Sequence, residues 1–154
     1  MVHIIPAEHG PHLQEARRLF EEYAASLNFD LCFQNFEREL ASLPGPYAPP
    51  EGALYLANLE ELTAGCVGVR NIADDICEMK RLYVRPRFRG RAVGRALAEA
   101  AIQAGRRCGY GTMRLDTLST MTEALTLYRS LGFVTIPAYY ANPILGAVYL
   151  ELLL

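Results

Sequence analysis

Apolar residues recur at two spacings along the chain, and these spacings predict where strands and helices lie. Residues 2–5 form a short apolar run that is typical of a strand. Residues 11–27 repeat apolar positions at helical spacing, and the helix they predict carries Leu13, Ala16, Leu19, Phe20 and Tyr23 on one face. A second short helix is predicted over residues 33–43, on the repeat of Phe33, Phe36, Glu37 and Leu40. Residues 44–52 are rich in proline and glycine, so they predict a loop.

Three strand-like runs follow this loop, at residues 53–60, 61–72 and 76–84. Because only short polar turns separate them, they predict an antiparallel meander. A helix comes next, with Gly109 as its expected C-terminal cap. Its apolar stripe contains Val93, Leu97, Ala100, Ala101, Ala104 and Cys108. Residues 112–118 then predict a strand that returns parallel to residues 76–84, as in a βαβ unit.

The last part of the chain predicts one more helix and two strands. The helix covers residues 121–133 and turns Ala124, Leu127, Tyr128 and Leu131 inward. The strands cover residues 134–137 and 147–154. The order of all these elements predicts a single α/β domain over residues 1–154, built on a mixed β-sheet flanked by about four α-helices.

Alternation within residues 76–84 assigns side chains to the two faces of that strand. Unless a bulge intervenes, Glu78, Lys80 and Leu82 share one face. The opposite face then carries Met79, Arg81 and Tyr83. The strand therefore presents charged groups on both of its faces.

Composition and charge narrow the class of protein. The chain has 154 residues, of which 51% are hydrophobic and 21% are charged, as in ordinary globular proteins. Its formal net charge of -2 argues against a general nucleic-acid binder. No apolar run approaches a membrane span, and the N-terminus has no charged leader followed by an apolar run, so a cytoplasmic protein is expected. The cysteines, at positions 32, 66, 77 and 108, lack the spacing of a zinc site or disulfide framework.

The most informative segment is RPRFRGRAVGRALAEA, residues 85–100, which places arginines and glycines where a helix begins. A helix N-terminus is already positive, so added arginines favour a bound anion there. Gly90 and Gly94 allow close backbone approach, and Arg89, Arg91 and Arg95 offer charged contacts to phosphate. The alternative is an ordinary solvated helix face. No GxGxxG pattern or Walker lysine is present, so the expected ligand is a pyrophosphate of another kind.

Three ordered segments carry a resemblance to a known family. CEMKRLYVRPRFRGRAVGRAL, LDT and LYRSLGF are similar to the corresponding parts of the GCN5-related N-acetyltransferase (GNAT) family, which uses acetyl-coenzyme A (acetyl-CoA). The family signature falls on residues 89–94, with Ala92 at the place of its usual first glycine. The resemblance implies a GNAT-like fold and acetyl-CoA as acyl donor, with no metal. The cofactor-binding residues that it implies are Leu82, Tyr83, Val84, Arg89, Gly90, Arg91, Ala92, Val93, Gly94 and Arg95.

The resemblance also implies catalytic residues. Tyr128 matches the family's tyrosine near the thioester sulfur, and its ordinary pKa of about 10 suits a general acid. Without the resemblance, its apolar surroundings would equally fit a core aromatic. Glu78 lies where some relatives place the base that deprotonates the amine. Glu78 can instead be an ion-pair partner of Lys80 or of an arginine on a neighbouring strand.

Residues on the acceptor side are predicted at two places. Asp116 and Thr117 end a parallel strand, where open sheets often bind ligands, although both can also cap the next turn. Tyr139, Tyr140 and Asn142 are predicted to line the acceptor pocket, and the two tyrosines alternatively fit a homodimer interface. By analogy with small bacterial relatives, the expected acceptor is a small primary amine such as an amino acid.

Two other functions fit the same motifs. A coenzyme A-binding sensor without catalysis would keep the phosphate loop, whereas it would not need Tyr128 and Glu78 in reactive positions. A protein or peptide N-acetyltransferase would need a more open groove for its acceptor. Neither a nucleic-acid partner nor a membrane partner is expected, and the three histidines lack the carboxylate and cysteine neighbours of a metal site.

Overall fold

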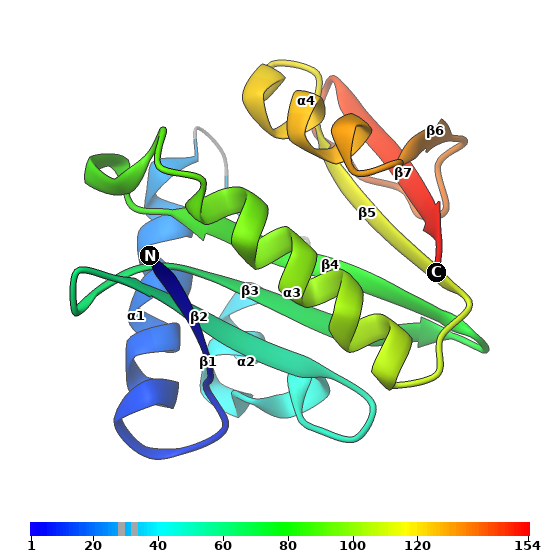
Figure 1. The fold of residues 1–154 in the computed structure, drawn as a ribbon. Helices are drawn as coiled ribbons and strands as arrows, with labels where there is room; N and C mark the ends of the chain where they lie inside the picture. The colour runs from blue at the N-terminus through cyan, green and yellow to red at the C-terminus, as the bar shows by residue number, and fades with distance from the viewer. Residues whose placement is uncertain (28–29, 32–33) are drawn as a thin grey trace.

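The computed structural model describes residues 1–27, 30–31 and 34–154 (Figure 1). Two residues used in the sequence patterns, Cys32 and Phe33, lie outside this range. Within the described residues, one seven-stranded sheet has the order β1-β2-β3-β4-β5-β7-β6. Its strands are β1 (Val2–Pro6), β2 (Ala53–Leu59), β3 (Leu62–Ala73), β4 (Ile76–Val84), β5 (Thr112–Leu118), β6 (Val134–Ile136) and β7 (Ala147–Leu153).

The helices flank this sheet, which confirms the predicted mixed α/β fold. They are α1 (Gly10–Ser26), α2 (Phe36–Ser42), α3 (Val93–Arg107) and α4 (Thr122–Ser130). Two short 3-10 turns, η2 (Gly45–Tyr47) and η3 (Pro86–Phe88), lie in the proline-rich loop and after β4. The prediction for α4 missed its buried Leu125, because the chosen stripe was offset toward Ala124 and Leu127, which are only partly buried.

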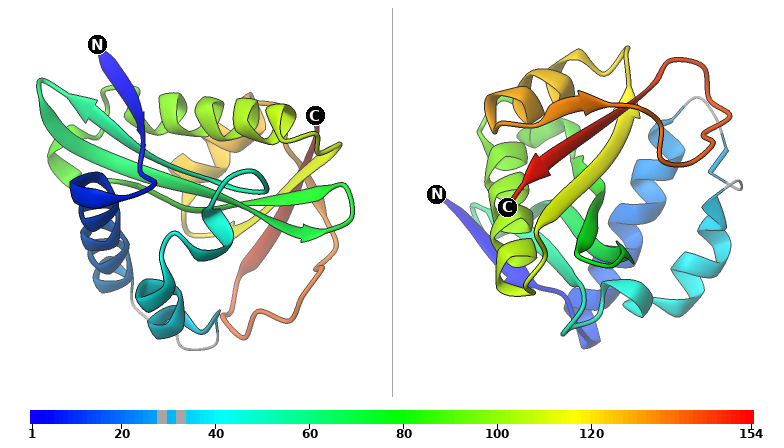
Figure 2. Two further views of the ribbon diagram at one scale, coloured as in Figure 1. Left: turned by 90° about the horizontal axis from the view of Figure 1, so that it is seen from below. Right: turned by 90° about the vertical axis from the view of Figure 1, so that its right-hand side faces the viewer.

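Two hydrophobic cores lie on the two faces of the sheet. The left-hand view of Figure 2 shows α1 and α2 below the sheet and α3 above it. The lower core contains Phe20 of α1 and Tyr47 of η2, whose rings meet edge to face at 5.8 Å. The upper core contains Leu97 of α3 and Tyr128 of α4. The sheet is therefore buried on both faces, and its strands β3 and β4 read as nearly continuous buried runs.

A β-bulge in β4 changes the predicted faces of that strand. Gly68 pairs with Lys80 and Cys66 with Tyr83, so β4 holds one extra residue between these pairs. Arg81 absorbs the extra residue with a left-handed φ of 59°. The alternation beyond Lys80 was therefore predicted wrongly. Leu82 packs against the upper core, on the face opposite to Glu78 and Lys80. Arg81 and Tyr83 instead lie on the same face as Glu78 and Lys80, toward α1 and α2.

Strands β4 and β5 are parallel, as predicted, and they separate soon after they begin. Their pairing is confined to Ile76–Glu78 with Thr112–Arg114. Beyond these residues β5 continues beside β7, and Figure 1 shows β4 and β5 diverging. The edges of both strands are consequently open toward each other over Met79–Val84 and Leu115–Leu118. A separation of this kind exposes backbone groups inside the sheet, where a ligand can pair with them.

Candidate active site

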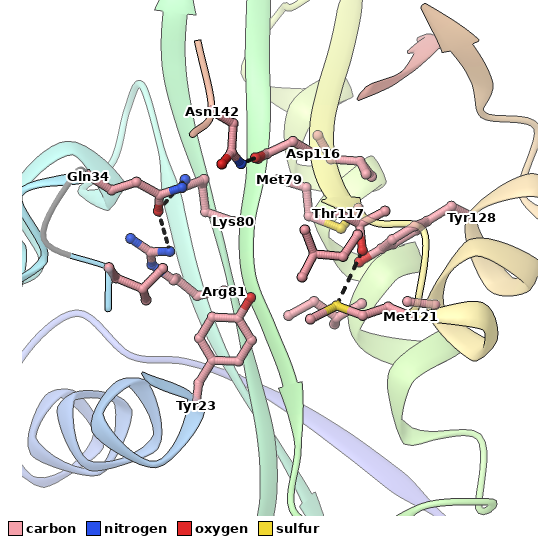
Figure 3. Close-up of a pocket in the computed structure, with 15 residues that line it drawn as sticks. Tyr23, Gln34, Met79, Lys80, Arg81, Asp116, Thr117, Met121, Tyr128 and Asn142 are labelled. Carbon is pink, nitrogen blue, oxygen red and sulfur yellow. Dashed lines mark hydrogen bonds between the residues drawn. The ribbon is translucent and has the colours of Figure 1, made fainter. Parts of the chain in front are cut away.

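The diverging strands enclose a cavity of about 120 Å³, here called the splay cavity (Figure 3). Its walls are residues 79–82 of β4 and residues 115–118 of β5. Side chains from other elements close it, and they are Tyr23, Leu31, Gln34, Met121, Ala124, Tyr128 and Asn142. Five predicted site residues, Leu82, Asp116, Thr117, Tyr128 and Asn142, thus meet in one cavity.

Tyr128 reaches the splay cavity from α4. Its ring is buried and meets Phe133 edge to face at 5.8 Å, so the predicted core packing is present as well. Figure 3 shows its side chain extending toward Thr117 at the cavity. Burial raises the pKa of the Tyr128 hydroxyl well above its usual value. The hydroxyl therefore keeps its proton at neutral pH, as a proton donor must.

Asp116 lies on the β5 wall of the cavity and accepts hydrogen bonds from neutral groups. Tyr140 donates its hydroxyl proton to Asp116 Oδ2, and Asn142 Nδ2 donates to the same oxygen at 2.9 Å. Tyr140 in turn packs against the rings of Tyr139 and Tyr149. The segment after β6 is thereby folded back onto β5, which brings three predicted acceptor-side residues together.

Glu78 faces a different hollow, here called the outer pocket, on the α2 side of β4. Its carboxylate is 1% exposed and is paired with Arg70 of β3, whose Nη2 lies 2.8 Å from Oε1. Tyr139 donates its hydroxyl proton to the other oxygen, Oε2. The ion pair that the sequence left open is therefore present, and its partner is the arginine of the neighbouring strand.

A groove on the opposite side of the cavity, here called the loop groove, collects most of the predicted cofactor residues. Its volume is about 670 Å³, and it runs from β4 past η3 to the start of α3 and α4. Eight predicted residues line it, namely Leu82, Tyr83, Val84, Arg89, Gly90, Ala92, Val93 and Gly94. Residues 120–123, which lead from β5 into the first turn of α4, also line the groove and are not among the predicted cofactor-binding residues.

The backbone of the loop before α3 is shaped to present N–H groups. Gly90 and Ala92 adopt left-handed φ values of 78° and 63°. A Cβ added at Gly90 would meet no atom within 4 Å, so the loop is open at this point. Among the described residues, the N–H groups of residues 90–95 have no backbone acceptor, and the first helical bond of α3 is Ala96 to Ala92. Successive free N–H groups at a helix N-terminus form an anion site.

The arginine side chains contribute less to this groove than their number suggests. Arg89 lines it and donates to the Val84 carbonyl at 3.1 Å. Arg91 pairs instead with Glu60 in the β2–β3 turn, and Arg95 donates to Ser130 of α4 at 2.6 Å. In this structure the loop groove is therefore built from backbone groups more than from guanidinium groups.

Sequence patterns missed several residues of the site. Lys80, Gln34 and Arg81 line both the splay cavity and the outer pocket. Alternation along β4 had placed Lys80 correctly beside Glu78, whereas no local pattern pointed to Gln34. Tyr23 of α1 lines the splay cavity and the loop groove. The helical spacing of residues 11–27 placed Tyr23 on the apolar face of that helix and did not indicate a contact with the site.

The described residues contain neither a group of three or more metal-ligating side chains nor a helix long and apolar enough to cross a membrane. Cys66, Cys77 and Cys108 are free thiols. Burial raises the pKa of the Cys66 and Cys77 thiols, so both remain protonated at neutral pH.

Comparisons with known proteins agree with this geometry. The acetyltransferase (GNAT) family matches residues 13–133. An uncharacterized N-acetyltransferase of Schizosaccharomyces pombe is 44% identical over 142 residues, which are 91% of this chain and 87% of that protein. One from Dictyostelium discoideum is 32% identical and covers 85% of this chain and 89% of its own length.

Solved structures share the fold at lower identity. A Streptococcus agalactiae acetyltransferase superposes with a TM-score of 0.79 at 21% identity, covering 99% of this chain and 98% of its own. A Salmonella typhimurium protein solved with acetyl-CoA superposes with a TM-score of 0.70 at 19% identity, covering 99% of this chain and 93% of its own. These two similarities show a common fold.

Proposed function

This chain belongs to the GNAT family of acetyltransferases, and we propose that it transfers an acetyl group from acetyl-CoA to a small primary amine. The observation that carries the proposal is that the splay cavity lies between the other two hollows, the loop groove and the outer pocket. The splay cavity shares Leu82 with the loop groove on one side, and it shares Gln34 and Lys80 with the outer pocket on the other. Two substrates can therefore approach from opposite sides and meet beside Tyr128, which suits direct attack in a ternary complex.

The residues of the loop groove fit acetyl-CoA. Free N–H groups at residues 90–95 suit a pyrophosphate, and the open edge of β4 at Leu82–Val84 suits an arm that carries amide groups. When bound, acetyl-CoA supplies a thioester whose carbonyl carbon accepts a nucleophile. A Cβ added at Gly90 would meet no atom within 4 Å, so the backbone at this position is open to a phosphate group.

Each step of the transfer has a group of the chain to assist it. Backbone N–H groups on the open edge of β4 stabilise the oxyanion that forms when the amine nitrogen attacks the carbonyl carbon. Tyr128 gives its proton to the sulfur as the carbon–sulfur bond breaks. Glu78 takes up the proton that the nitrogen releases, through water in the outer pocket. Asp116, Thr117, Tyr139, Tyr140 and Asn142 border the acceptor.

The test is release of free coenzyme A thiol from acetyl-CoA in the presence of amino acids, polyamines, arylalkylamines and peptides. Wild type is compared with Tyr128→Phe, and Tyr55→Phe on β2, remote from the cavity, is the matched control. We expect one class of small amine to drive turnover, and Tyr128→Phe to lower kcat about 100-fold or more with unchanged affinity for acetyl-CoA. Tight binding of acetyl-CoA with no thiol release for any acceptor would overturn the proposal and favour a sensor.

A further inference from the structure

Lys80 is an unusual cation in this protein. The chain has 15 lysine and arginine residues, and Lys80 is the only lysine among them. Its side chain is 6% exposed, yet it lines both the splay cavity and the outer pocket. Figure 3 shows it between Gln34 and the pair formed by Asn142 and Asp116. The single ammonium side chain thus lies at the junction of the splay cavity and the outer pocket, from which the acceptor is proposed to enter.

The other buried charges near Lys80 are already paired. Arg81 forms a two-pronged ion pair with Glu39 of α2, with both nitrogen–oxygen distances 2.9 Å. Arg70 is paired with Glu78. Each of these carboxylates therefore has its own guanidinium partner.

Lys80 has no such partner among residues 1–27, 30–31 and 34–154. Its Nζ donates to the neutral Gln34 Oε1 at 3.1 Å, and Arg81 Nη1 donates to the same oxygen at 2.7 Å. Asp116 is the matching case on the β5 wall, since its hydrogen bonds come from the neutral Tyr140 and Asn142. Gln34 Nε2 donates to the Tyr140 hydroxyl at 3.2 Å, so one hydrogen-bonded chain links the two charges.

Lys80 is a buried ammonium and Asp116 a half-buried carboxylate, and both lie on one cavity without an ionic partner among the described residues. Such an arrangement is costly, above all for the buried ammonium, unless a ligand completes it. A ligand that does so carries one charge of each sign. From this arrangement we propose that Lys80 binds the carboxylate of the acceptor while Asp116 receives its amino group as an ammonium, so that the acceptor is a free amino acid. The ammonium passes one proton through water to Glu78, and its nitrogen then has the lone pair with which it attacks the thioester. The inference rests on the proposed acetyl transfer and names the substrate class of the same site.

The chemistry of lysine fits this role. Its ammonium is a compact charge with three rotatable donors, of which Gln34 occupies one in this structure. Burial, aided by the nearby Arg81, lowers the pKa of Lys80 to about 8, so most molecules carry the charge at neutral pH. A carboxylate bound beside the ammonium favours the charged form further.

The first test compares three acceptors that share one side chain: the amino acid that reacts best, its amide, and the amine that lacks the carboxyl group. Wild type is expected to prefer the amino acid about 30-fold or more in kcat/KM. Lys80→Met should abolish this preference by lowering kcat/KM for the amino acid alone, with the amide and amine within about 3-fold of wild type. Arg106→Met, at an exposed position in the last turn of α3, controls for loss of one positive charge.

The second test uses the single lysine as its own reporter. In protein labelled with 13C-lysine, the side-chain signals of Lys80 titrate without overlap from other lysines. With coenzyme A present, the amino acid should raise the pKa of Lys80, whereas its amide should not. This measurement uses wild-type protein, so it does not depend on how Lys80→Met folds.

The outcomes separate the two proposals. Equal kcat/KM for the amino acid and its amide overturns the carboxylate assignment and leaves acetyl transfer intact. If Lys80→Met lowers kcat/KM equally for all three acceptors, Lys80 acts in proton transfer or packing, and the carboxylate assignment is overturned as well. Absence of thiol release with every acceptor means that acetyl transfer itself fails, and the inference then fails with it.

Discussion

At the scale of single residues, the charges around the splay cavity divide into paired and unpaired groups. Arg81 with Glu39, and Arg70 with Glu78, are closed ion pairs that hold α2, β3 and β4 in place. Lys80 and Asp116 contact only neutral groups among the described residues. Removing one partner of a closed pair leaves a buried charge, whereas removing an unpaired charge relieves a cost. Stability and activity should therefore respond oppositely at Lys80.

Replacement of Lys80 by methionine should stabilise the protein at neutral pH. A pKa of about 8 in the folded state, against 10.5 for the free side chain, corresponds to a penalty of about 3 kcal/mol below pH 8. Between pH 8 and pH 10 the unfolded chain binds more protons at this group, so wild-type stability rises with pH. Urea unfolding of wild type and Lys80→Met at pH 7, 8 and 9.5 should show that the difference between their free energies of unfolding becomes smaller as the pH rises. A constant difference would contradict a buried ammonium.

Replacement of Glu78 by glutamine tests the proposed proton acceptor. We expect kcat to fall about 100-fold with unchanged affinity for acetyl-CoA, because the amide cannot take up a proton. Glu151→Gln is the matched control, since Glu151 of β7 is paired with Arg114 of the neighbouring strand at 2.9 Å. Steady-state kinetics and calorimetry give both quantities. Equal kcat in the two variants would assign Glu78 to the ion pair with Arg70 alone.

At the scale of elements, two departures from regular geometry form the site. The bulge at Arg81 turns this side chain toward Glu39 while Leu82 stays in the upper core. The left-handed turns at Gly90 and Ala92 leave the N–H groups before α3 directed away from the helix's own carbonyls. The bulge lies within β4 and the loop directly precedes α3, so a strand and a helix supply a rigid frame for them.

The loop before α3 offers a matched pair of glycine variants. Gly90 and Gly109 have left-handed φ values of 78° and 89°, and an added Cβ would meet nothing within 4 Å at either. Alanine at each position should cost about 1 kcal/mol of stability through the backbone alone. Only Gly90→Ala should weaken acetyl-CoA binding, by about 10-fold, because Gly109 ends α3 away from the groove. Thermal unfolding and calorimetry measure both effects, and equal affinities would exclude the loop as the phosphate site.

At the scale of the whole molecule, the sheet is held together at one end of β4 and β5 and open at the other. Three residue pairs join these strands, and beyond them β5 pairs with β7 alone among the described strands. The open end receives the loop groove from one side and the outer pocket from the other. The fold thereby brings two hollows to one cavity, which is the arrangement that the proposed transfer between two substrates requires.

Acetyl-CoA should protect the open edge of β4. The N–H groups at Leu82–Val84 that face β5 have no strand neighbour on that side, so their exchange with solvent should slow when the arm of acetyl-CoA pairs with them. Amide hydrogen exchange with and without acetyl-CoA measures this, with residues 53–59 of β2 as the unchanged reference. Exchange that slows equally in β2 would indicate global stabilisation by mass action in place of local pairing.

Much of this protein is readable from its sequence because the relevant signals are local. Apolar spacing predicted the meander and the parallel return of β5, and the arginine–glycine segment predicted the loop before α3. Glycine tolerance of left-handed φ and the polarity of a helix N-terminus both act within a few residues. The family resemblance came from the same segments, and the family match confirmed it.

Tertiary structure alone decided which charges meet. The bulge at Arg81 depends on how β4 pairs with β3, and no spacing within β4 specified it. Glu78 pairs with Arg70, which lies eight residues earlier on the neighbouring strand. Lys80 donates to Gln34, which lies 46 residues earlier in the chain. Periodicity gives the face on which a side chain lies, whereas strand register and helix packing decide its partner. Lys80 and Asp116 can be recognised as unpaired charges among the described residues only from the tertiary structure, which shows that Glu39 and Glu78 are paired with arginines.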